Sequence, residues 1–77
     1  MNQLIRFQYP SVDIERQQVT IELIHGEEVI MTVFVDLLSN EMHKTGNLER
    51  VKLTPYDLDA LFAGLWANAR YLLQENV

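Results

Sequence analysis

One long helix near the C-terminal end of the chain sets the strongest constraint on the fold. Apolar residues recur every three or four positions from residue 58 to residue 73, the spacing of a helix that packs one face on a sheet. Thr54-Pro55-Tyr56-Asp57 predicts the helix start, because a hydroxyl N-cap, a proline at the first helical position and an acid at the third resemble a capping box. A helix over residues 55–74 would be about 30 Å long. The residues expected to face the sheet are Leu58, Leu61, Phe62, Leu65, Ala69, Leu72 and Leu73, with Trp66 at their margin.

The opposite side of this helix has too few charges for a surface that meets water alone. Between residues 58 and 73 the charged side chains are Asp59 and Arg70. Small residues and one tyrosine, spaced four, three and four apart, lie along a single line of the helix instead. These residues are Ala60, Gly64, Ala67 and Tyr71. A helix face of this kind suits contact with another chain.

Gly64 bears most directly on that interpretation. Glycine inside a helix costs about 0.5–1 kcal/mol relative to alanine, so its presence calls for a reason, such as the close approach of another backbone. The sequence therefore predicts a partner or dimer interface, with the helices of two copies crossing and Tyr71 as the aromatic anchor. The alternative is a bland surface on which the alanines are simply good helix formers and Gly64 is tolerated.

Three segments upstream have the patterns of strands. Residues 4–9 alternate in the period of a half-buried strand, which Pro10 should end before a turn at residues 11–13. Residues 17–24 and 28–35 are rich in β-branched side chains and predict a hairpin around Gly26. The apolar residues of both arms fall at odd positions, so a three-residue loop or a bulge is needed to place them on one face. We expect an odd-length loop near Gly26.

The other face of this hairpin carries two large apolar residues, Ile30 and Phe34, among polar ones. One interpretation is that they contact a partner protein. The other is that the helix-facing side becomes the even one at one end of the hairpin, or that a loop covers them.

The middle of the chain is harder to interpret. Residues 37–44 fit a short helix capped by Asp36 and ended by Gly46, and equally a strand end followed by a loop. Residues 49–53 alternate charged and apolar side chains, which predicts a short edge strand. The expected fold is α+β: a single compact domain over residues 1–77, with a small antiparallel sheet of three or four strands packed against one long helix.

Composition excludes several functional classes. The 77 residues include no cysteine, so disulfides and thiolate zinc sites are ruled out, and oligomerisation is the remaining way to support so small a core. Eleven acidic against six basic residues, the latter scattered, argue against direct nucleic-acid binding. Acidic mimicry of nucleic acid by Glu22, Glu27, Glu28, Asp57 and Asp59 is an open alternative. No apolar run is long enough for a membrane span and the N-terminal residues lack a signal-peptide pattern, so we expect a cytoplasmic protein.

Catalytic chemistry finds no support in the sequence. His25 and His43 are isolated, and neither has a second histidine at a ligand spacing. Asp57 and Asp59 point to different sides of a helix, so they do not form an acid–base pair. We expect no catalytic residues, no metal and no cofactor. A small-ligand or metal-binding domain that uses one of the histidines is the weakest alternative.

These observations favour a non-enzymatic protein that acts by stoichiometric protein–protein binding, as a regulator, adaptor or inhibitor of a larger protein complex and itself a homodimer. Inhibitors of host nucleic-acid-processing systems encoded by phages or mobile elements are one example of this class, although no residue singles them out. The alternative is a structural subunit of a symmetric homo-oligomeric assembly. The candidate interface residues are Ala60, Gly64, Ala67, Tyr71, Ile30 and Phe34.

Overall fold

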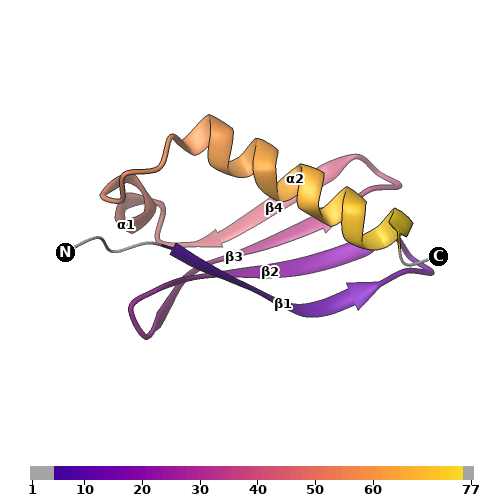
Figure 1. Cartoon of the computed structure of the whole chain (residues 1–77), viewed down its shortest axis with the longest axis horizontal. Helices are drawn as coiled ribbons and strands as arrows, with labels where there is room; N and C mark the ends of the chain where they lie inside the picture. Colours follow the sequence, from indigo (N-terminus) through magenta and orange to yellow (C-terminus); the bar gives the residue numbers. More distant parts are fainter. Residues whose placement is uncertain (1–4, 76–77) are drawn as a thin grey trace.

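The computed structural model describes residues 5–75 and contains four antiparallel strands, one short helix and one long helix (Figure 1). The strands form one sheet in the order β1-β2-β3-β4, and the long helix runs diagonally across one face of it. The α+β prediction is therefore confirmed. The elements are β1 (Ile5–Asp13), β2 (Gln18–His25), β3 (Glu28–Asp36), β4 (Glu41–Gly46), α1 (Leu48–Lys52) and α2 (Leu58–Glu75).

Strand β1 is longer than the sequence predicts. The expectation that Pro10 ends it before a turn at residues 11–13 is wrong, because pairing with β2 continues to Asp13. The register shifts between Gln8 and Ser11, so Pro10 sits in an irregularity of the ladder. β1 is an edge strand. Proline, which has no N–H to donate, is tolerated at such a position.

The β2–β3 hairpin aligns the odd positions as expected, by the bulge that was the alternative to a three-residue loop. His25 pairs with Glu28, so the loop has two residues and the predicted odd-length loop is wrong. The register shifts where Leu23 pairs with Met31 and Ile24 with Val29, which leaves Ile30 as an extra residue on β3. This bulge at Ile30 puts Val19, Ile21 and Leu23 opposite Val35, Val33 and Met31.

The short helix over residues 37–44 and the edge strand over residues 49–53 are both wrong. The alternative for residues 37–44, a strand end followed by a loop, holds for their first part: β3 ends at Asp36, residues 37–40 form a turn and residues 41–46 form β4. Residues 48–52 form α1, not an edge strand over 49–53. Asn47 caps α1 by accepting a hydrogen bond from the Arg50 backbone N–H at 3.2 Å. Along α1, Val51 alone is fully buried, so the segment lacks the alternation of a strand.

Helix α2 closes the core. It begins at Leu58, and Asp57, not Thr54, occupies the capping position: its Oδ1 accepts the Asp59 N–H at 3.3 Å and its carbonyl accepts the Leu61 N–H at 2.8 Å. Thr54 instead donates its hydroxyl to the Val51 carbonyl at 2.6 Å. The α2 residues buried against the sheet are Leu61, Leu65, Ala69 and Leu73. They pack on Ile30 and on the odd-numbered residues of β1, β2 and β3, and no helix within residues 5–75 covers the far face of the sheet (Figure 1).

Candidate functional site

The side of α2 that points away from the sheet is exposed along its length. Ala60, Gly64, Ala67 and Tyr71, here called the outer stripe, are all exposed, and Tyr71 retains 65% of its accessible surface. A Cβ placed on Gly64 would have no atom within 4 Å. Nothing in the packing of the described residues therefore requires glycine at that position. Whether the outer stripe is an interface stays a prediction.

A groove lies beside the outer stripe, between α2 and the edge strand β1. Its volume is about 270 Å³. We call it the helix-edge groove. It is lined by Phe7, Tyr56, Asp57, Ala60, Leu61, Gly64, Leu65 and Asn68. Two members of the outer stripe, Ala60 and Gly64, thus form part of its wall, and their small side chains leave the hollow open.

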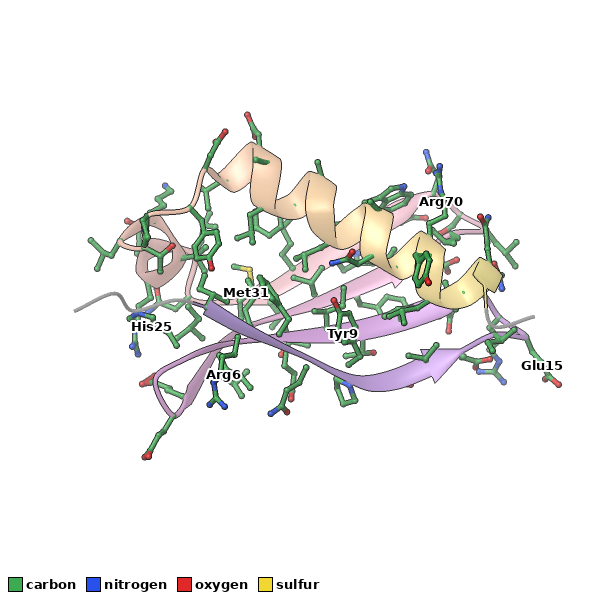
Figure 2. The ribbon with its side chains drawn as sticks, in the orientation of Figure 1. Arg6, Tyr9, Glu15, His25, Met31 and Arg70 are labelled. Atoms are coloured by element: carbon green, nitrogen blue, oxygen red, sulfur yellow. The ribbon has the colours of Figure 1, made fainter. Side chains whose placement is uncertain are left out.

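The groove has aromatic and polar ends set by two different elements. Phe7 comes from β1, where alternation turns it toward α2, and Tyr56 comes from the connection that follows α1. On the α2 side, Asn68 Nδ2 donates to the Tyr9 hydroxyl at 3.4 Å, and Figure 2 shows Tyr9 rising from β1 toward the helix. Apart from Asp57, the lining is uncharged, so the arrangement suits an aromatic or aliphatic side chain.

Two charges flank the outer stripe on the side away from the groove. Asp59 and Arg70 are eleven residues apart, which places them within about 20° of each other around the helix axis. Figure 2 shows Arg70 projecting from α2 away from β1. Among the described residues, neither side chain has an ion-pair partner. Both are thus available to a neighbouring chain.

The hairpin candidates separate. Ile30 is 3% exposed and belongs to the core, so the expectation that it lies exposed beside Phe34 is wrong. The bulge turns the Ile30 side chain to the helix side of the sheet. This agrees with the alternative that an even-numbered residue faces the helix at one end of the hairpin. Phe34 is half-buried, and its ring lies 6.2 Å from that of His43, its neighbour on β4.

Of the titratable residues that the structure describes, Tyr56 and Asp57 line the groove, and the histidines and the other carboxylates do not. His25 ends β2, and His43 Nε2 lies 3.3 Å from Glu41 Oε2 on β4. Hydrogen bonds lower the pKa of Asp36 below its usual 3.8, chiefly the bond from the Ser39 backbone N–H and then that from Gln18. Within residues 5–75, no three histidine or carboxylate side chains are placed to hold one metal ion. In the same residues, no helix is both long enough and apolar enough to cross a membrane.

Most of the groove has no signal in the sequence. Phe7 fits the pattern of a strand, Tyr56 fits the pattern of a helix start, and Asn68 belongs to no motif. Residue 7 and residues 56–68 meet only after the sheet has formed and α2 has crossed it. No local pattern signals that contact. Comparison with protein-family models, with curated protein sequences and with solved structures gave no match.

Proposed function

We propose that this chain is a cytoplasmic, non-enzymatic protein that acts by stoichiometric binding to another protein chain, as a regulator, adaptor or inhibitor. The observation that carries the proposal is the helix-edge groove and its continuation into the outer stripe. Together they make an exposed surface that is aromatic at one end, formed by small residues along its length and poor in charge. Exposed aromatic side chains and a low density of charge are typical of the centre of protein interfaces.

The size of the groove supports a protein ligand over a small molecule. Sites for small molecules and cofactors usually enclose about 300–1,000 Å³ and surround most of the ligand. At about 270 Å³, this groove is smaller and has room for one or two side chains. Tyr71, outside the groove and exposed, extends the contact surface along the helix. A partner would bury the groove and the outer stripe together.

A photo-reactive amino acid tests the proposal directly. Benzoylphenylalanine replaces Ala67, on the outer stripe, and the cells that contain the protein are irradiated. We expect discrete covalent adducts with protein from position 67. The matched control places the same residue at Gln8, an exposed position of β1 that alternates with the groove-lining Phe7. Equal adducts from both positions, or none from position 67, would refute the proposed surface.

A second candidate function, a structural subunit of a symmetric assembly, is favoured by the sheet edges. β1 and β4 are the outermost strands of the sheet in the described residues, and each presents unpaired backbone groups. Light scattering over a range of concentrations separates the two functions. A mass that keeps growing beyond the dimer supports a subunit, whereas a mass that stops at the monomer or dimer supports a regulator.

A further inference from the structure

We infer that a second copy of this chain occupies the helix-edge groove, with the two α2 helices antiparallel and Tyr71 of each copy seated in the groove of the other. The inference rests on the proposed function, because it names the partner of the same surface. Three independent features support it: the spacing of the outer stripe, the fit of Tyr71 to the groove and the placement of two charges.

The outer stripe is symmetric along the helix. Ala60 and Tyr71 lie about 8 Å on either side of the point midway between them, and Gly64 and Ala67 lie about 2 Å on either side of the same point. A two-fold axis through that point sets Tyr71 of one copy opposite Ala60 of the other, and Ala67 opposite Gly64. The largest residue of the stripe therefore meets a small one at both ends. Such self-complementarity is what a two-fold interface requires.

The groove provides the space that Tyr71 needs. Side chains on a helix tilt toward its N-terminus, so in an antiparallel copy the Tyr71 ring tilts from Ala60 toward Gly64. Both residues line the groove, and Phe7 provides an aromatic wall. A Cβ on Gly64 would enter open space in the single chain, whereas in the dimer it would meet the ring. The dimer thus supplies the reason for glycine that the single chain lacks.

The charges select the antiparallel arrangement. A two-fold axis across antiparallel helices brings the same flank of both copies together. Asp59 lies about 10 Å and Arg70 about 7 Å from the midpoint, in opposite directions, so Asp59 of each copy comes level with Arg70 of the other to within about 3 Å along the axis. In a parallel dimer, the flank that carries Asp59 and Arg70 would instead face the opposite flank of the second copy, which carries Asn68. The two unpaired charges are complementary in the antiparallel dimer alone.

Sedimentation equilibrium of the full chain and of charge-swapped variants tests the inference. We expect the parent to form a dimer. Asp59→Arg and Arg70→Asp should each raise the dissociation constant about tenfold or more, since each change creates two repulsive pairs. The double variant should restore most of the affinity. Arg16→Asp, the same charge change in the β1–β2 turn, is the matched control and should leave the dissociation constant unchanged.

Tyr71→Ala tests the groove separately. It removes two anchors per dimer and should weaken association by about 10²–10³-fold. Because Tyr71 is 65% exposed, the far-UV circular dichroism of the dilute variant should match that of the parent. Three results would each overturn the inference. The parent could stay monomeric, Tyr71→Ala could leave the dissociation constant unchanged, or the double charge variant could associate no more tightly than the single variants.

Failure of this inference is distinguishable from failure of the proposed function. If the purified chain is monomeric but position 67 still cross-links to a different protein in cells, the second copy is excluded and the protein-binding surface stands. If position 67 gives neither a self-adduct nor another adduct, both proposals fail.

Discussion

Substitution of Gly46 by alanine tests the contact that joins β4 and α1 to the rest of the sheet. Gly46 has φ of 135°, a conformation that residues with a Cβ rarely adopt. An added Cβ would lie 2.6 Å from the Ile30 carbonyl oxygen and 2.7 Å from Met31 Cα. These are backbone atoms of the β3 bulge. The Ile30 oxygen also accepts the Asn47 N–H at 2.8 Å, so it cannot move away without loss of that bond.

The magnitude follows from these contacts. A residue with a Cβ at positive φ costs about 1–2 kcal/mol, and loss of the hydrogen bond to Ile30 adds about 1 kcal/mol. Relief of the two short contacts by displacement of β3 adds a further cost, for a total of about 3–5 kcal/mol. This is comparable to the whole stability of a domain of this size. We therefore expect Gly46→Ala to be largely unfolded at room temperature.

Urea denaturation followed by the fluorescence of Trp66, the single tryptophan, measures this loss. Gly26→Ala is the matched control, because Gly26 has φ of 70° but its Cβ would have no atom within 4 Å. That variant should lose about 1 kcal/mol. If Gly46→Ala loses no more than Gly26→Ala, the described packing of Gly46 against the bulge at Ile30 is refuted.

Three further predictions concern α2 and the β3–β4 turn. Gly64→Leu should raise the unfolding free energy of the dilute monomer by about 0.5–1 kcal/mol, because glycine is a poor helix former. The same variant should raise the dissociation constant of the dimer in sedimentation. If it associates like its parent, Gly64 is not part of the interface. Because the pKa of Asp36 is lowered in the folded chain, this carboxylate stabilises the fold above its usual pKa, and the stabilisation is lost as the pH falls through the folded-state pKa. The difference in unfolding free energy between the parent and Asp36→Asn, measured by urea titration, should therefore shrink below about pH 4. A difference that stays constant with pH would contradict this. Asp57→Ala should lower the unfolding free energy by about 1 kcal/mol, because it removes the side chain that caps α2. An unchanged melting temperature would contradict the assignment of Asp57 as the cap in place of Thr54.

The parts of the fold that could be predicted are those with a repeated apolar period. Val19, Ile21 and Leu23 alternate on β2, and Leu61 and Leu65 recur at a helical step on α2, because each of these elements buries several side chains on one face. The periodicity of such elements survives in the sequence. The same periodicity also predicts which side of α2 is exposed.

The parts that could not be predicted bury few side chains. β4 is an edge strand whose Met42 is its one half-buried residue, and α1 buries Val51 alone, so neither shows a period. Residues 37–40 contain signals that a helix start and a turn share, and Asn40 resolves the choice in the structure with φ of 59°. The bulge at Ile30 has no local signal either. Its position depends on pairing with β2.

The candidate site divides in the same way. Ala60, Gly64, Ala67 and Tyr71 share one helix, so their common exposure follows from spacing alone. The groove cannot be predicted from spacing, because Phe7 of β1 and the α2 residues are far apart in the sequence and meet only in the folded chain. Ile30 is not part of the exposed candidate surface, because the bulge at this residue turns its side chain to the helix side while Met31 and Val33 keep their expected face.

An interspin distance measured across the dimer tests the central claim most directly. The chain has no cysteine, so Gln74→Cys gives a single labelling site on the exposed side of α2. In the antiparallel dimer, the two labelled positions lie about 25 Å apart along the axis. With helix axes about 8–10 Å apart, the total separation is about 27 Å. A pulsed electron paramagnetic resonance distance near this value is the predicted result. A distance near the helix separation alone, as in a parallel pair, or a signal without dipolar modulation, as for a monomer, would contradict the account.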